Sequence, residues 1–143
     1  MTETGQGRKD RSTRRTGSTM DRTRDALQLL PVSSSVRDAR RFVGSTIDGL
    51  GVASVRDLAL LLTSELVTNA VVHAGGEIRV CVIGDDRRIR VAVEDTSDTP
   101  PRRREAGEGA VSGRGLCLVA ELAEHWGVDI RDGGKAVWFE LEV

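Results

Sequence analysis

The segment from Thr63 to Ala74 constrains the fold more than any other part of the chain, because it closes a long apolar helical pattern that begins near Ser54. Apolar residues occur on almost every side of this helix, which is typical of a helix in a core rather than on a surface. Glu65, Asn69 and His73 nevertheless recur at intervals of four residues, so they form one polar row on the helix.

This polar row has two interpretations. A carboxylate on a buried helix is costly unless a partner satisfies it. A bound metal–phosphate group would satisfy it, because a hard cation prefers carboxylate and amide oxygens. Alternatively, the row is the one solvated stripe of an otherwise packed helix. The helix alone fits both interpretations equally, and residues farther along the chain favour the first.

Length and composition indicate one globular domain. The chain has 143 residues, of which 38% are hydrophobic and 30% charged, and the formal net charge is −1. This charge argues against a generic nucleic-acid or membrane-surface binder. No apolar run approaches the roughly 20 residues of a membrane span, and the polar N-terminus lacks the apolar centre of an export signal. Cys81 and Cys117 each lie in an apolar run, which indicates reduced core thiols in a cytoplasmic protein.

Residues 1–25 are expected to be a disordered tail, followed by a single domain over residues 26–143. The tail is rich in Thr, Ser, Gly and Arg and has no hydrophobic period. Such a segment cannot bury enough apolar surface to offset the entropy of ordering it. Its arginines would suit an acidic partner, but a solvated tail is the simpler interpretation.

The patterns in the remaining chain predict an α+β fold. We expect strands at about residues 26–32, 77–83, 88–94, 128–131 and 135–143, and helices at about 36–50, 54–75 and 116–126. The serines at 33–35 are candidate N-caps for the first helix, and Gly49 and Gly51 are expected to end it. A two-layer sandwich, with a mixed, mostly antiparallel sheet and helices on one face, is the economical packing of this order.

Two further stretches complete a candidate site. Asp95 follows an apolar strand and stands at the mouth of the sheet, where its carboxylate can accept a hydrogen bond from an exocyclic amine; the alternative is a turn-forming role. Gly113 and Gly115 open a helix, so backbone amides and the positive helix end can approach an anion; the alternative is a flexible hinge. The long polar segment 96–112 between them is typical of a lid or binding loop.

These motifs, in this order and spacing, resemble the ATPase domain shared by Hsp90, DNA gyrase, histidine kinases and MutL, known as the Bergerat or GHKL fold. Residues 65–74 are similar to its N box, residues 93–97 to its first glycine box and residues 113–119 to its second. The resemblance covers about residues 26–143. It is greatest for the stand-alone bacterial branch, the anti-sigma-factor serine kinases, whose typical ending is similar to residues 126–139.

The resemblance implies a role for each matching residue. Asn69 would bind the Mg²⁺ that bridges the ATP phosphates, and Glu65 would be the general base for the attacking hydroxyl. Asp95 would take the adenine amino group, with Ser97 beside it. The phosphates would be held by Gly113, Arg114, Gly115 and Leu116, under a lid formed by residues 100–112. Phosphoryl transfer needs chiefly a metal, donors to the phosphates and a positioned nucleophile.

Two residues depart from the family pattern. Ser97 stands where the first glycine box usually has glycine, and its Cβ narrows the approach to adenine. Ala136 stands at the expected position of a threonine that hydrogen-bonds the adenine region in other members. Both departures bear on the affinity for ATP more than on the fold.

By this resemblance, the chain is an anti-sigma factor and Mg²⁺-dependent serine/threonine kinase that phosphorylates an anti-anti-sigma antagonist of the STAS type. A homodimer is expected, with the first strand and helix as the interface, and no direct contact with nucleic acid or membrane. The alternative is a non-enzymatic module that binds nucleotide or only a partner protein. An ATP hydrolase without a protein substrate is less favoured, because no transducer domain of the larger ATPases is present.

Overall fold

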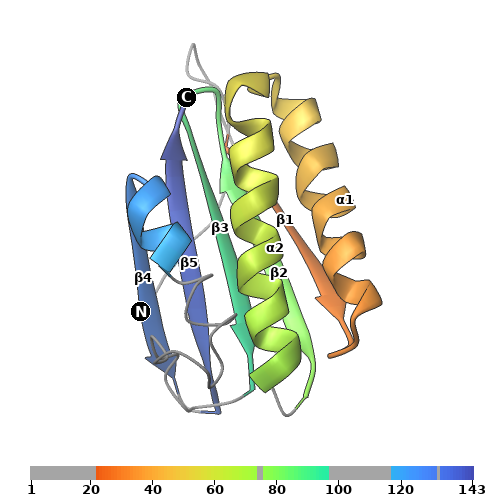
Figure 1. The fold of residues 1–143 in the computed structure, drawn as a ribbon. Coiled ribbons are helices and arrows are strands. Elements are labelled where there is room, and N and C mark those ends of the chain that lie inside the picture. Colours follow the sequence, from red (N-terminus) through yellow and green to blue (C-terminus); the bar gives the residue numbers. More distant parts are fainter. Residues whose placement is uncertain (1–21, 74–75, 97–116, 132) are drawn as a thin grey trace.

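A computed structural model describes residues 22–73, 76–96, 117–131 and 133–143 of the chain (Figure 1). The elements are β1 (Thr23–Leu29), α1 (Ser34–Leu50), the 3₁₀-helix η2 (Ala53–Val55), α2 (Arg56–His73), β2 (Ile78–Gly84), β3 (Arg88–Asp95), β4 (His125–Arg131) and β5 (Gly134–Glu142). A further helical segment covers residues 117–122. This order of elements confirms the predicted α+β class.

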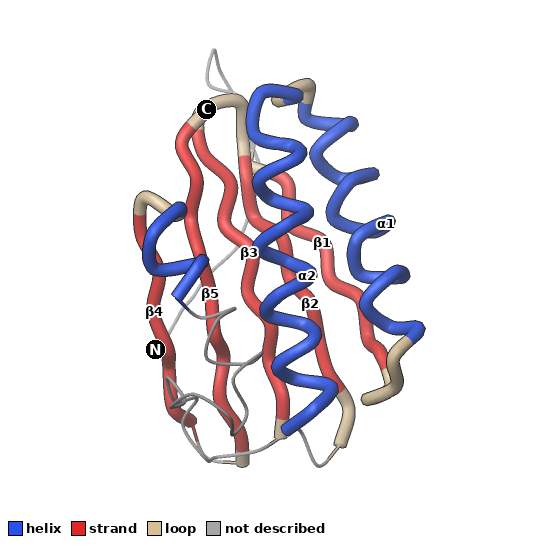
Figure 2. Tube along the Cα trace, in the orientation of Figure 1, coloured by secondary structure: helices blue, strands red, loops and turns tan. Residues whose placement is uncertain are grey.

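The five strands form one sheet in the order β1-β2-β3-β5-β4 (Figure 2). Every neighbouring pair is antiparallel. The sheet is therefore fully antiparallel, which agrees with the predicted mostly antiparallel arrangement. β5 lies between β3 and β4, so the C-terminal hairpin joins the rest of the sheet through β5.

A turn at Asp85 sets the register of β2 against β3. The backbone N–H of Asp85 donates to the carbonyl of Arg88 at 3.0 Å. Asp85 Oδ1 accepts from the backbone N–H groups of Arg87 and Arg88 at 2.8 and 3.1 Å, which fixes the turn locally. Val80 is thereby placed opposite Val93, and both are buried.

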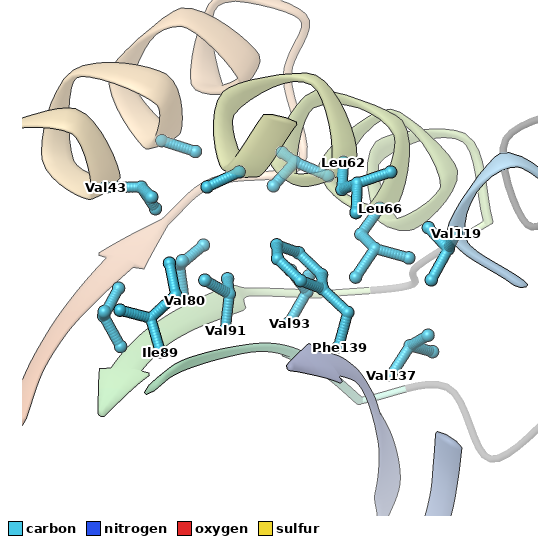
Figure 3. Close-up of a cluster of buried hydrophobic side chains, with 14 of the residues drawn as sticks. Val43, Leu62, Leu66, Val80, Ile89, Val91, Val93, Val119, Val137 and Phe139 are labelled. Atoms are coloured by element: carbon cyan, nitrogen blue, oxygen red, sulfur yellow. The ribbon is translucent and has the colours of Figure 1, made fainter. Parts of the chain in front are cut away.

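Helices α1 and α2 cover one face of the sheet and enclose the core with it (Figure 1). Figure 3 shows side chains from the two layers pointing toward one another: Val43, Leu62 and Leu66 from the helices, and Val80, Ile89, Val91, Val93, Val137 and Phe139 from the sheet. Each of these side chains is almost completely buried, which contributes roughly 1.5–3 kcal/mol per residue. α2 contacts α1 on one side and strands β2, β3 and β5 on the other, which confirms its predicted role as a core helix.

The ends of α1 agree with the predicted boundaries, but the expected serine cap is absent. Ser33 occupies the N-cap position without a side-chain cap hydrogen bond. Ser35 is buried instead, and its hydroxyl donates to the carbonyl of Leu30 at 2.6 Å. Gly51 ends the helix in the left-handed conformation (φ 73°), where its N–H donates to two carbonyls of the last turn. Gly49 lies within the helix rather than ending it.

The bounds of β1, of the helix before β4 and of β4 itself also differ from the predictions. β1 begins at Thr23, three residues before the predicted strand, and therefore includes part of the segment assigned to the tail. The predicted helix over residues 116–126 is wrong at its C-terminal end, because the helical segment ends at 122 and β4 begins at His125. Trp126 and Val128 pack against the core from a strand, so tertiary burial overrides the apolar helical pattern here.

Candidate functional site

Helix α2 carries Glu65 and Asn69 at the border of the core. Its buried side consists of Ala59, Leu62, Thr63, Leu66, Val67 and Ala70. Glu65 and Asn69 are half-buried, and His73 at the end of the helix is exposed. Because burial is only partial, the Glu65 carboxylate and the Asn69 amide avoid the full free-energy cost of desolvation. Both groups are available to a ligand at this border. Because Glu65 and Asn69 are half-buried and His73 is exposed, the polar row is neither fully buried nor fully solvated.

The C-terminal ends of α2 and β3 and the start of β5 lie at the same end of the molecule (Figure 1). Asp95, the last residue of β3, pairs with Ile78 at the start of β2 and with Lys135 near the start of β5. Gly76, which lies between α2 and β2, is close to Thr96. A Cβ added at Gly76 would be 2.8 Å from Thr96 Oγ1. The C-terminal end of α2, where His73 completes the polar row, and the end of β3, which carries Asp95, therefore lie at the same end of the sandwich.

Asp95 forms a buried ion pair with Lys135. Lys135 Nζ donates to Oδ1 and Oδ2 of Asp95 at 3.1 and 3.0 Å. The side chain of Asp95 is 3% exposed and that of Lys135 is 6% exposed. An ionised carboxylate at this depth needs compensation, and the ammonium group supplies it. Because removal of one partner from such a pair costs about 3–5 kcal/mol, the pair holds the carboxylate firmly in place.

Gly134 allows the backbone of β5 to approach the end of β3. A Cβ at this position would overlap the carbonyl oxygen of Asp95. Glycine is therefore required by close backbone contact at this position. The same contact places Lys135, the next residue, where its amine reaches the Asp95 carboxylate.

Ala136 does not face the same side of the sheet as Asp95, so its predicted place beside adenine is wrong. In the register of β3 and β5, Ala136 pairs with Glu94, and it lines a hollow on the face opposite the helices. Successive side chains of a strand point to opposite faces. The residue of β5 that shares a face with Asp95 is Lys135.

Sequence reasoning missed Lys135, although a signal was available. Lys135, Val137, Phe139 and Leu141 alternate along β5 and are all buried. This alternation places the lysine on the apolar face of its strand, where a charged residue needs a partner.

The remaining predicted site residues lie outside the described residues. These are Ser97, Gly113, Arg114, Gly115 and Leu116, together with the predicted lid at 100–112. Their assignment to adenine and phosphate binding stays a prediction. Of the predicted site residues, the structure describes Glu65 and Asn69, which lie on α2, and Asp95, which ends β3.

The sheet face opposite the helices contains a hollow of about 480 Å³ that the sequence did not suggest. The ring of Trp138 covers Gly127, because a Cβ at Gly127 would lie 2.7 Å from the ring. The guanidinium carbon of Arg90 stands 3.9 Å from the centroid of the same ring, and Arg90 also pairs with Glu140 at 3.2 Å. Trp138 is thus held between a glycine and a cation.

Cys81 lines the same hollow as a half-buried free thiol. Its Sγ donates to Glu94 Oε2 at 3.8 Å. Burial raises the pKa of the Cys81 thiol above its ordinary value, and the nearby Glu94 carboxylate raises it further. Cys117 is also a free, half-buried thiol, so neither cysteine is a fully buried core residue as predicted.

Two further features concern only the described part of the chain. None of its helices is both long and apolar enough to cross a bilayer. It also contains no group of three or more His, Cys, Asp or Glu side chains placed to hold a metal ion by themselves.

Comparison with known proteins defines the class of this protein. Residues 31–141 match the model of the histidine kinase-like ATPase domain. This match spans most of the chain, so the chain belongs to the family of histidine kinase-like ATPase domains. The resemblance inferred from the motifs is confirmed at the level of the family.

A solved structure with a similar fold is the crystal structure of the RsbU and RsbW domains of Rv1364c from Mycobacterium tuberculosis. The TM-score is 0.57 and the sequence identity 17%. The similarity covers 82% of this chain and 32% of that chain, so this chain spans about one third of the length of that protein. At this identity the comparison shows a shared fold. No curated protein sequence matches the chain.

Proposed function

We propose that this chain binds ATP with Mg²⁺ and transfers the terminal phosphoryl group to a serine or threonine of a partner protein. The observation that carries the proposal is the match to the histidine kinase-like ATPase domain, together with Glu65 and Asn69 on α2 and Asp95 at the end of β3. These residues supply two carboxylates and one amide, which suits a purine amine and a hydrated cation.

Each of the three residues has a distinct proposed role. Asp95, held by Lys135 and backed by Gly134, accepts a hydrogen bond from the exocyclic amine of adenine. Asn69 would offer its amide oxygen to Mg²⁺, and the bound cation would neutralise charge on the phosphates. Glu65, one helical turn away, accepts the proton of the attacking hydroxyl at a carboxylate oxygen.

We infer that the partner is an anti-anti-sigma antagonist and that the chain also acts as an anti-sigma factor. This part of the proposal rests on the motif resemblance to the anti-sigma-factor serine kinases and on the shared fold with the structure that contains an RsbW domain. We also propose a homodimer through β1 and α1. In its favour, β1 is an edge strand, and Leu30 and Val32 between the two elements are 62% and 46% exposed.

Calorimetric titration with ATP and Mg²⁺ tests nucleotide binding. The wild-type chain is expected to bind, and Asn69→Ala is expected to bind at least tenfold more weakly. Thr46→Ala, on α1, is a control that should leave the affinity unchanged, because the Thr46 hydroxyl donates to the carbonyl of Phe42 within the same helix. Undetectable binding by the wild type and by Asn69→Ala alike would refute the proposal.

A second candidate function is a partner-binding module without kinase activity. The observation that favours it is the engagement of both Asp95 oxygens by Lys135. Transfer of radioactive phosphate from ATP to a co-purified partner distinguishes the two functions. Partner binding without transfer, in the presence of nucleotide and Mg²⁺, would support the second function.

A further inference from the structure

The ion pair between Asp95 and Lys135 places a hydrogen-bond acceptor and a donor side by side at the end of the sheet. Nζ of Lys135 lies 3.0 and 3.1 Å from the two carboxylate oxygens of Asp95. Both residues come from strand positions next to a chain connection: Asp95 ends β3, and Lys135 is the second residue of β5. The pair therefore stands at the edge of the core, not in its middle.

The polar edge of adenine has the complementary pattern. Its exocyclic amine is a donor, and the adjacent ring nitrogen, N1, is an acceptor. A carboxylate alone can recognise the amine but would repel the lone pair of N1. A lysine ammonium has three donors, so it can keep one Asp95 oxygen and donate another proton elsewhere.

We propose that Lys135 is a base-reading residue that donates a hydrogen bond to N1 of adenine while Asp95 accepts one from the amine. This inference rests on the proposed ATP binding and adds a residue to it. Because Nζ contacts both carboxylate oxygens, releasing one oxygen to the amine leaves the ion pair intact through the other. Neither charge then has to be left uncompensated when the base arrives.

Burial strengthens this contact and makes it selective. The side chain of Lys135 is 6% exposed, so water competes little for the hydrogen bond that its ammonium group donates. A buried donor left without its acceptor costs about 1–3 kcal/mol, so the site should discriminate against a base that lacks N1. A buried ion pair often stabilises a fold no more than a hydrophobic pair of similar size, whereas recognition of a base uses a donor beside an acceptor.

The test combines a variant with a nucleotide analogue. Mg²⁺-ATP and Mg²⁺-1-deaza-ATP, in which carbon replaces N1, are titrated calorimetrically into the wild type and Lys135→Met. Methionine keeps the length of the side chain but has no donor. The wild type should bind 1-deaza-ATP roughly tenfold more weakly than ATP, as expected for one charged hydrogen bond. Lys135→Met should lose about the same factor for ATP and should bind the two nucleotides equally.

Other outcomes overturn the inference. If Lys135→Met lowers the affinity for both nucleotides by the same factor, Lys135 affects binding only by stabilising the folded site. If Lys135→Met binds ATP more tightly, Lys135 competes with the base for Asp95. The wild-type comparison needs no variant: equal affinity for ATP and 1-deaza-ATP overturns the inference even when Lys135→Met does not fold.

Results that refute the proposed function differ from results that refute only the role of Lys135. If the wild type binds neither nucleotide, ATP binding itself is wrong, and the role of Lys135 in base reading is wrong with it. If the wild type binds ATP and Asn69→Ala does not, ATP binding stands, and the analogue comparison alone decides the role of Lys135.

Discussion

Gly134 lies directly against the carbonyl oxygen of Asp95, so that any side chain at position 134 would overlap the backbone of β3. This contact joins the C-terminal hairpin to the strand that carries the candidate adenine-binding carboxylate. It also fixes which residues of β5 face the helices, since Lys135 follows immediately. A small backbone requirement thereby determines which side chain meets Asp95.

Gly134→Ala is therefore expected to destabilise the protein by about 1–3 kcal/mol, because the added methyl group forces β3 and β5 apart. Urea unfolding followed by circular dichroism measures the loss. Gly49→Ala is the matched control, since nothing lies within 4 Å of a Cβ there and the residue is in α1. The control should gain roughly 0.5–1 kcal/mol. Equal stability of wild type and Gly134→Ala would contradict the close contact.

Glu65→Gln separates binding from chemistry. Glutamine keeps the size and the hydrogen-bonding capacity of the side chain, so the affinity for Mg²⁺-ATP should change less than about threefold. The rate of phosphoryl transfer should fall by roughly 10²–10⁴-fold, because the proton acceptor for the hydroxyl is lost. Single-turnover transfer from radioactive ATP measures the rate. A variant that transfers phosphate at the wild-type rate would remove Glu65 from the role of general base.

The raised pKa of Cys81 predicts a pH dependence of stability. In the folded protein the thiol stays protonated above its ordinary pKa of about 8.5, while in the unfolded chain it ionises. The unfolded state thus binds fewer protons in this range, and the free energy of unfolding falls as the pH rises above about 8.5. Urea unfolding from pH 7 to 10 should show a steeper fall for the wild type than for Cys81→Ala. Parallel curves for the two proteins would contradict this prediction.

The stacking of Trp138 on Gly127 predicts a non-additive pair of substitutions. Gly127→Ala places a methyl group within the space of the ring and should cost about 1–3 kcal/mol. In a Trp138→Leu background the same change should cost less than about 0.5 kcal/mol, because no ring is displaced. Urea unfolding of the four proteins gives the coupling energy. An equal loss of stability in both backgrounds would mean that the Trp138 ring does not restrict the size of the side chain at position 127.

Much of the fold followed from periodicity. The 3.6-residue period of α1 and the alternation in β2 and β3 gave elements within two or three residues of their observed bounds. Helix α2 was predicted to be central because apolar residues occur on almost every side of it. The order and spacing of the motifs at residues 65–74, 93–97 and 113–119 then indicated the family, which the domain match confirms.

The errors occurred where tertiary contacts decide. A run such as residues 117–126 fits a helix and a buried strand almost equally, and only packing against β5 makes His125 the start of a strand. Ala136 was placed beside adenine by a motif comparison that is one residue out of register. A shift of one residue in a strand moves every side chain to the other face. The motif comparison therefore did not identify Lys135 as the residue opposite Asp95.

Trp126 and Trp138 are the two tryptophans of the chain, which has no tyrosine, and they lie on the two faces of one hairpin. Indole fluorescence therefore reports on β4 and β5 and is silent about α1. Fluorescence that changes at a lower urea concentration than the helical circular dichroism would show that this hairpin loosens first. Since Lys135 belongs to the same hairpin, such an opening would expose the Asp95 carboxylate while the helices remain folded.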